Sequence, residues 1–534
     1  MSSPAPTSPD LSEKSKKYDR QIRLWGDHGQ KLLENSKVCL INATALGTEL
    51  LKSLVLPGIG SFTIVDGEKV TEEDLGSNFF LDTDCLGLSR AQVATQCLLE
   101  LNPDVRGDYI DESPEHVMAH TQDFFNKFTV VIATALPEKT LIPLSKHLWD
   151  SGVPLVVCRS IGFMGYIRLQ VKEHTVIESH PDNSKPDLRL LTPWPDLQEY
   201  LESINVAKLD QKTRSHTPAL VILYYYLKKY KDSHNGNVPK TRTEKEVLKK
   251  MIRESPTPDE NGIKTLEENF TEAIHSVNYC FGDNGIPEHV QKILSDDCCL
   301  NLTQKSSPFW VMTAALKEFV LAEGDLPIQG SLPDMAADTL SYVTLQQLYH
   351  KQAQSQAEVV YRRASQILNV LGLPQETITE SEVKLFCKHA RELHVIRGSC
   401  IAYEYERTGL DLSSYLEDSD SLIFYYVILR GLERFIGEFN TYPGQFEDQV
   451  EPDVSKLKNI IGKLLSDWSC SHILSDEKVL EVCRYGGAEL HSVSAILGGC
   501  AAHEVIKLIT HQYKPLNNVF VYNAITSTSA TFCL

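Results

Sequence analysis

The sequence predicts an α/β fold in which a doubly wound, Rossmann-like sheet domain is interrupted by a large, mostly helical insertion. Short apolar strands alternate with helical stretches between residues 37 and 171, long helical patterns fill the middle of the chain, and the last residues return to a helix followed by a strand. The chain has 534 residues. At about 150 residues per domain, this length suggests about two to four domains.

The sheet domain is predicted to begin with a strand at residues 38–41, because this run is short and continuously apolar, as in strands buried on both faces of a parallel sheet. A helix with leucines on one face follows and stops near Pro57. Further strands are predicted at residues 61–66, 128–134 and 153–158. Strands that alternate with helices in this way are typical of a doubly wound sheet.

The middle of the chain, residues 172–487, is predicted to be mostly helical. One long helix should carry the apolar residues from Val360 to Leu371 and end at Gly372, which suits a helix C-terminus. The basic, turn-rich stretch 228–250 is predicted to be a solvated loop that leads into a helix. The predicted domains are a loose tail at 1–17, a discontinuous sheet domain at 18–171 and 488–534, and the helical insertion at 172–487.

Charge and composition exclude several classes of protein. A net charge of -19 argues against sequence-independent binding of nucleic acid. The N-terminal residues lack the apolar core of a secretory signal, and no run reaches the roughly 18 apolar residues of a membrane span. Thirteen cysteines without a CxxC pair indicate reduced thiols. We therefore expect a cytoplasmic and nuclear protein without nucleic-acid partners.

The stretch INATALGTELL (Ile41–Leu51) stands where a nucleotide-binding protein carries its glycine-rich loop. Such a loop needs glycine for a tight turn, for close approach of the phosphate and for helix packing. Asn42 and Thr44 stand at the first two positions, and only Gly47 remains. Asp66 ends the second predicted strand, where a ribose-binding carboxylate or a simple turn cap would stand. The loop alone therefore predicts a degenerate nucleotide site.

Three stretches resemble the activating enzymes of ubiquitin and ubiquitin-like proteins, together with the bacterial adenylyltransferases that share their ThiF-type fold. They are Lys17–Gln30, the strand, loop and helix up to Asp66, and Ile496–Ala524. The segment Gly330–Tyr349 is similar to the larger, non-catalytic chain of the heterodimeric members that serve neddylation. The resemblance covers essentially the whole chain and implies a pseudo-adenylation domain.

In this family, ATP and magnesium are held by a glycine loop, an Asn-x-x-Arg-Gln segment, a lysine and a later aspartate, because cations stabilise phosphate charge and a carboxylate positions the metal. The resemblance places Asp74 at the asparagine, Ser77 and Asn78 at the arginine and glutamine, Arg90 at the lysine, and Leu136 at the metal-binding aspartate. The resemblance therefore implies that this chain binds no cofactor or metal and that ATP and magnesium lie in the partner subunit.

Arg20 matches the arginine of the family's N-terminal Tyr-x-Arg-Gln segment, which reaches across paired adenylation domains to the partner's nucleotide. The resemblance implies this contact in trans, since an arginine from a neighbour stabilises phosphate charge. From the residues alone, the segment Tyr18–Gly26 is a short amphipathic helix with solvated arginines. Residues expected at the partner interface are Ile22, Leu24, Trp25, Leu332, Met335, Tyr342, Gly498 and Gly499. The two glycines suit close packing inside the sheet domain equally well.

The family's catalytic chain also carries a nucleophilic cysteine followed by threonine, which accepts the modifier as a thioester. No cysteine in the predicted insertion has that neighbour: Cys280, Cys298, Cys299, Cys387 and Cys400 are followed by other residues. Of these five, only Cys387 has cationic neighbours that would favour a thiolate. We therefore expect no catalytic residue and no covalent modifier on this chain.

The resemblance implies a regulatory subunit that pairs with a catalytic subunit holding the ATP site, a zinc site and the thioester cysteine. That subunit would adenylate the C-terminus of the ubiquitin-like modifier. One alternative is a self-sufficient NAD- or ATP-using enzyme with a variant loop. Another is an interaction scaffold for a receptor tail, such as the cytoplasmic tail of amyloid precursor protein, which would place some of the protein at the plasma membrane.

Overall fold

The computed structural model describes residues 16–121, 123–182, 185–255, 266–281, 285–405, 412–470 and 475–534. Most of the predicted tail, residues 1–15, lies outside these ranges. The chain divides into two compact units: the first is formed by Met1–Val176 and Val395–Leu534, and the second by Ile177–His394. Each unit has its own hydrophobic core.

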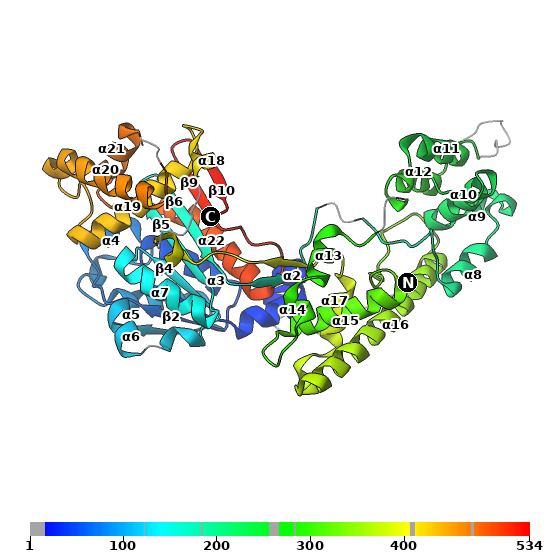
Figure 1. The fold of residues 1–534 in the computed structure, drawn as a ribbon, viewed down its shortest axis with the longest axis horizontal. Coiled ribbons are helices and arrows are strands. Elements are labelled where there is room, and N and C mark those ends of the chain that lie inside the picture. The colour runs from blue at the N-terminus through cyan, green and yellow to red at the C-terminus, as the bar shows by residue number, and fades with distance from the viewer. Residues whose placement is uncertain are drawn as a thin grey trace, which may run out of the picture. The chain divides into compact units, whose positions relative to one another are not determined.

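The first unit is built on one eight-stranded sheet with the order β10-β9-β6-β5-β4-β1-β2-β3 (Figure 1). Its strands are β1 (Lys37–Ile41), β2 (Ser61–Val65), β3 (Arg106–Ile110), β4 (Val130–Thr134), β5 (Leu155–Ile161), β6 (Met164–Gln170), β9 (Val519–Asn523) and β10 (Thr528–Phe532). Strands β1 to β5 run parallel, and β6, β9 and β10 extend the sheet in antiparallel pairs. The parallel half has the doubly wound order 3-2-1-4-5, which confirms the predicted fold class.

Sequence identified β1, β2, β4, β5 and β9, but not β6, which is central and fully buried, nor the edge strands β3 and β10. In β4 and β5 every residue is buried, and in β1 all but the first are, as the continuous apolar runs predict. Strand β3 was not predicted because it is a partly exposed edge strand whose residues are mostly polar. A separate two-stranded sheet pairs β7 (His174–Val176) with β8 (His394–Ile396).

Helices cover both faces of the large sheet. The α-helices of this unit are α2 (Asp19–Asn35), α3 (Ala45–Val55), α4 (Glu72–Ser77), α5 (Arg90–Leu101), α6 (Pro114–His120), α7 (Glu138–Ser151), α18 (Ser413–Leu416), α19 (Ile423–Phe439), α20 (Val450–Asp467), α21 (Asp476–Arg484) and α22 (His491–Thr510). Helices α2, α3, α5 and α22 share one core with the sheet, and α6, α7, α19, α20 and α21 share the other. Short 3-10 turns lie at η1 (Thr83–Cys85), η2 (Phe124–Lys127), η5 (Ile401–Tyr405) and η6 (Glu447–Gln449).

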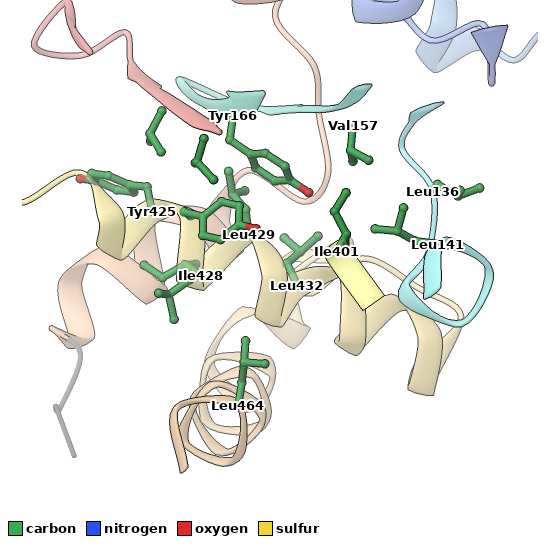
Figure 2. Close-up of a cluster of buried hydrophobic side chains, with 14 of the residues drawn as sticks. Leu136, Leu141, Val157, Tyr166, Ile401, Tyr425, Ile428, Leu429, Leu432 and Leu464 are labelled. Carbon is green, nitrogen blue, oxygen red and sulfur yellow. The ribbon is translucent and has the colours of Figure 1, made fainter. Parts of the chain in front are cut away.

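The second core corrects the predicted end of the insertion from residue 487 to residue 394. Figure 2 shows Tyr166 of β6 facing Leu429 and Leu432 of α19, with Leu464 of α20 below α19, on the side away from the strand. Helices α19 to α21 therefore cover one face of the sheet and belong to the first unit. Helical periodicity predicts that these segments are helices, but it does not indicate which apolar surface each helix covers.

A buried ionic network joins α19 to the sheet. Arg168 of β6 donates from Nε to Glu404 at 2.8 Å, and Arg430 of α19 donates to the same carboxylate at 3.2 Å. The hydroxyl of Tyr426 also donates to Glu404, at 2.9 Å. Both arginine side chains are fully buried. Removing one partner of such a network leaves an uncompensated buried charge, so the network fixes the position of α19 on the sheet.

Helix α22 is, among the described helices, the one long and apolar enough to cross a membrane by length and composition. Within its most apolar window, 61% of the helix is buried inside the protein. It packs against α3 and the sheet and is a core helix of the first unit.

The second unit is mostly helical, as predicted. Its α-helices are α8 (Pro195–Ser203), α9 (Gln211–Ser215), α10 (Ala219–Ser233), α11 (Arg242–Arg253), α12 (Glu268–Cys280), α13 (Glu288–Leu294), α14 (Asp297–Leu300), α15 (Pro308–Glu323), α16 (Thr339–Leu371) and α17 (Glu380–Lys388), with 3-10 turns η3 (Val206–Lys208) and η4 (Gln375–Thr377). Helix α16 ends as predicted at Gly372, which has φ 70°. The loop predicted at 228–250 is confined to the residues between α10 and α11.

Candidate functional site

The candidate site lies at the carboxyl ends of β1 and β4, where the order of the parallel strands reverses. In open α/β sheets this switch point is where ligands bind. The loop Asn42–Thr44 leaves β1 here, Leu136 follows β4, and Asp66 follows β2. The structure therefore brings the predicted loop, the acid and the position of the family's metal ligand to one edge of the sheet.

The turn after β1 is kept without its glycine. Asn42 has φ 64°, in the left-handed region that asparagine tolerates better than most residues. Its side-chain amide donates to the carbonyl of Thr134 at 2.9 Å, and the Thr134 hydroxyl donates back to the carbonyl of Asn42 at 2.7 Å. These two bonds tie the loop to β4 in place of contacts to a ligand.

Thr44 caps helix α3 with its own side chain. Its hydroxyl oxygen accepts from the backbone N–H of Gly47 at 3.3 Å and lies 3.2 Å from the hydroxyl of Thr134. Gly47 is retained for packing, because a Cβ there would lie 2.8 Å from the carbonyl oxygen of Asn42. The threonine side chain thus fills space beside the loop that a glycine would leave open to phosphate.

Glu489 is a half-buried acid near the start of α3, in the segment that pairs with Gly162 after β5. Burial raises the pKa of Glu489 to about 7, while the charge of Arg159, the backbone N–H groups of Leu46 and Ala45, and the charge of Arg90 oppose the rise. At the start of α3 itself, the side chain of Thr44 accepts from the N–H of Gly47, one of the groups that a helix leaves without a partner.

Asp66 and Arg90 form an ion pair with each other. Arg90 donates from Nε to Asp66 at 2.7 Å and from its other nitrogens to Asp66 at 3.2 Å and Asp74 at 3.1 Å. Asp66 also accepts from the backbone N–H groups of Ala43 at 2.8 Å and Glu68 at 2.9 Å. The two carboxylates raise the pKa of the Arg90 guanidinium against the effect of burial. Neither the acid nor the cation is directed toward a ligand.

The remaining family positions have structural partners. Asn78 is buried; its amide donates to the carbonyl of Ala43 at 3.2 Å and its oxygen accepts from Thr48 at 3.2 Å. Ser77 is half-buried at the end of α4. Leu136 is 3% exposed and belongs to the core in Figure 2. The residues at this edge therefore do not fit ATP and magnesium: their donors are engaged, and a core side chain stands where the metal ligand would be.

Arg20 lies near the start of α2, with 91% of its side chain exposed and its Nε 4.0 Å from Asp19. Leu24 is 59% exposed, and Ile22 is half-buried. Trp25 packs on the core of the first unit and donates to Gln30 at 3.1 Å. Of the N-terminal residues expected at the interface, Leu24 thus presents the most apolar surface, and Trp25 mainly packs within the chain.

The other expected interface residues also divide into those that pack within the chain and those that are exposed. Leu332 and Met335 pack on the core of the second unit, where Met335 also lines a cavity of about 210 Å³, and Tyr342 is half-buried. A Cβ at Gly498 would lie 2.9 Å from the backbone nitrogen of Leu50, so this glycine serves the packing of α22 on α3. Gly499 has no atom within 4 Å of that position and faces open space.

The cysteines in the predicted insertion are mostly buried. Burial raises the pKa of Cys387 and of Cys280 to about 12, and of Cys299 to about 11. Cys400 is buried and Cys298 half-buried. The lysine beside Cys387 in sequence does not offset burial, so this residue carries a thiol rather than a thiolate at neutral pH. Among the described residues, no three His, Cys, Asp or Glu side chains are grouped so that they could hold a metal.

Sequence reasoning missed three residues of this site. Thr134, Arg159 and Glu489 reach it from β4, from β5 and from the segment before α22. Nothing in the local sequence marks Thr134 or Arg159, because their role arises only when distant segments meet. For Glu489 the one available signal was an acid placed between a glycine pair and a helix start.

Comparison with known proteins agrees with this geometry. The sequence model of the ThiF family matches residues 18–534, and the chain belongs to that family. A Drosophila melanogaster protein named Nedd8-activating enzyme E1 regulatory subunit is 50% identical over 541 residues, which span 100% of both chains. Its Xenopus laevis counterpart is 47% identical over 529 residues, covering 98% of this chain and 99% of the relative.

A plant relative extends the comparison: the Arabidopsis thaliana protein named NEDD8-activating enzyme E1 regulatory subunit AXR1 is 39% identical over 524 residues, covering 97% of this chain and 96% of the relative. Within the ThiF family, the chain is therefore similar over its whole length to the regulatory subunits of this activating enzyme. These matches confirm the resemblance inferred from the sequence.

Proposed function

We propose that this chain is the regulatory subunit of the heterodimeric enzyme that activates NEDD8. It pairs with a catalytic subunit, which binds ATP and magnesium, adenylates the C-terminus of the modifier and forms the thioester. The names and full-length coverage of the relatives support this function. The contribution of this chain is a folded pseudo-adenylation domain that assembles with the partner.

The observation that carries the proposal is the pairing of Arg90 with Asp66. In a working site these positions would serve the phosphates and the ribose, whereas here the two side chains bind each other at 2.7 Å. Thr44, whose side chain caps the start of α3, adds to this. The domain keeps the fold of the family, but the residues that would bind the ligand bind each other. This arrangement fits a subunit whose partner carries out the chemistry.

Arg20 is the group through which this chain would act on the partner's nucleotide. It is charged, almost fully exposed and joined to the sheet domain by α2. Two residues before it, Tyr18 is buried, and its hydroxyl lies 3.1 Å from Asp104, which anchors the start of the helix. An exposed arginine on an anchored helix is suited to stabilise phosphate charge across an interface.

Two measurements test the proposal. The purified chain, titrated with ATP and magnesium in a calorimeter, should release no binding heat, whereas the heterodimer should bind ATP. The chain should also co-purify with one equivalent of an adenylation-type subunit from cell extract. ATP binding by the isolated chain would contradict the proposal and favour the self-sufficient enzyme.

Binding to the cytoplasmic tail of amyloid precursor protein, and location in the cytoplasm, in the nucleus or at the plasma membrane, stay predictions from the family resemblance. The net charge of -19 is compatible with a basic partner segment but does not identify one. Binding of the purified heterodimer to an immobilised tail peptide, compared with a scrambled peptide of equal charge, tests the scaffold role.

A further inference from the structure

We propose that Asn102 and Tyr18 are positioning residues for Arg20: they fix the first turn of α2 and so set where the exposed guanidinium lies. The inference rests on the proposed function, because it takes Arg20 to act on the partner's nucleotide. A charged group stabilises a reacting phosphate best when it is held in the right place before the reaction. Neither positioning residue needs to contact the nucleotide, because both act through the backbone of α2.

The part of α2 that carries Arg20 is a short segment. Gly26 has φ 68° and interrupts the helix, so this segment runs from Asp19 to Trp25. The side chain of Arg20 is 91% exposed, and its Nε lies 4.0 Å from Asp19. An exposed ion pair of this length does little to fix a side chain. The location of Arg20 therefore depends on how the segment is attached to the rest of the first unit.

Tyr18 attaches the start of this segment. Its carbonyl accepts from the N–H of Ile22 at 2.9 Å, which closes the helical turn around Arg20. Its side chain is 2% exposed. The hydroxyl accepts from the side-chain amide of Asn102 at 3.0 Å and donates to the carboxylate of Asp104 at 3.1 Å. Because the hydroxyl both donates and accepts, its direction is fixed, and with it the first turn of α2.

Asn102 connects Tyr18 to two other helices. It follows the last residue of α5 and is 1% exposed. Its amide also donates to the carbonyl of Val55, the last residue of α3, at 2.8 Å. Its side-chain oxygen accepts from the ammonium group of Lys17. One buried side chain thus joins the ends of α3 and α5 to the residues that precede α2.

The loop after α3 admits Tyr18 and holds the segment at a second point. Gly58 in this loop has φ 86°, and a Cβ there would lie 2.7 Å from the hydroxyl oxygen of Tyr18, so the approach requires glycine. The carbonyl of the preceding Pro57 accepts from the side-chain amide of Gln21 at 2.7 Å. Residues on both sides of Arg20 are therefore attached to the same part of the first unit, and Arg20 projects from between them.

A double-mutant cycle in the assembled heterodimer tests whether the two residues act through Arg20. Tyr18→Phe removes the hydroxyl and keeps the buried ring, and Asn102→Ala removes the amide that joins the helices. We expect each substitution to slow ATP–pyrophosphate exchange at saturating ATP by about threefold or more. In the Arg20→Ala chain the same substitutions should change the rate by less than about twofold, because no guanidinium is left to misplace. A purely structural role would slow exchange equally with and without Arg20.

Asn269→Ala is the matched control. Asn269 is a fully buried asparagine of the second unit, and its amide donates to the carbonyls of Arg214 and Thr217, each at 2.7 Å. Its replacement should lower the melting temperature of the chain, as Asn102→Ala should, but leave the rate of exchange at the wild-type value. Rates are measured below the melting temperature of every variant. If Asn102→Ala does not fold, the milder Tyr18→Phe gives the same test.

The assignment would be overturned if Arg20→Ala slowed exchange while Tyr18→Phe did not, or if Tyr18→Phe slowed exchange equally in the presence and absence of Arg20. An exchange rate unaffected by Arg20→Ala would also overturn it, because nothing would then remain to be positioned. These failures differ from failure of the proposed function, which would appear as ATP binding by the isolated wild-type chain or as a lack of pairing with a catalytic subunit.

Discussion

Arg90 and Asp66 form a bidentate pair, with Nε 2.7 Å from one carboxylate oxygen and a terminal nitrogen 3.2 Å from the other. Asp66 has no exposed side-chain surface, and Arg90 has 13%. At the corresponding positions a nucleotide-binding domain would hold a cation for phosphate and an acid for ribose. In this chain the two groups stabilise the edge of the sheet instead.

Arg90→Ala should therefore be destabilising. Removing one partner of a buried pair leaves an uncompensated charge, and we expect the free energy of unfolding to fall by about 3 kcal/mol or more. Urea denaturation measures this loss from the unfolding transition of the first unit. Lys69→Ala breaks an exposed pair with Asp111 and should cost about 1 kcal/mol or less. Equal losses for the two variants would contradict a structural role for Arg90.

Gly47→Ala should also be destabilising, because the new Cβ would lie 2.8 Å from the carbonyl oxygen of Asn42. The start of α3 would have to move away from β1, which we expect to cost about 1–3 kcal/mol. Gly437→Ala in α19 is the control: nothing lies within 4 Å of its Cβ position, and alanine there should stabilise by up to about 1 kcal/mol. Thermal unfolding should give a lower melting temperature for Gly47→Ala and a higher one for Gly437→Ala.

Glu489 should make stability depend on pH. Its pKa is about 7 in the folded chain, mainly because of burial, against an ordinary value of 4.5. Between these values the unfolded chain loses the proton first, so the contribution present below pH 4.5 is lost as pH rises through 7. The loss amounts to about 3 kcal/mol.

Glu489→Gln cannot titrate. Its unfolding free energy minus that of wild type should therefore increase by up to about 3 kcal/mol from pH 4.5 to 7.5 and then stay level. Urea denaturation across this range provides the measurement. The unfolding free energy of Glu477→Gln should change with pH in the same way as that of wild type. A constant difference between Glu489→Gln and wild type would contradict the raised pKa of Glu489.

Arg20→Ala should slow ATP–pyrophosphate exchange by the assembled heterodimer by about tenfold or more, if this arginine stabilises phosphate charge in trans. Pairing with the catalytic subunit, measured by gel filtration, should be unchanged. Arg253→Ala removes an exposed arginine from α11 of the second unit and serves as the control. An exchange rate equal to wild type would reduce Arg20 to a solvated surface residue.

Sequence predicted the parts of the fold that depend on local pattern. Strand β1, the turn at Asn42 and the start of α3 follow one another along the chain, so apolar runs and Gly47 were sufficient to place them. The end of the insertion was not predictable in this way, because α19 has the same helical periodicity whether it packs on the sheet or on other helices.

The site was predictable as a loss of ligand groups but not as a set of new contacts. Departures such as Thr44 and Leu136 are visible when the family motif is laid on the chain. The partner of Arg90 and the position of Glu489 beside the end of β5 depend on contacts between distant segments. Gly162 and Glu489 form a parallel bridge although they lie far apart in the chain, and no spacing rule relates them.

The pairing of Arg90 with the tethered carboxylate of Asp66 also bears on how this subunit responds to its surroundings. A domain that binds a free ligand only when folded gains stability as the concentration of that ligand rises. A tethered carboxylate is present at a fixed effective concentration, set by the chain that carries it. Folding of this subunit should therefore be indifferent to the energy charge of the cell, so that a fall in ATP would limit the partner's chemistry without depleting the supply of folded regulatory chain.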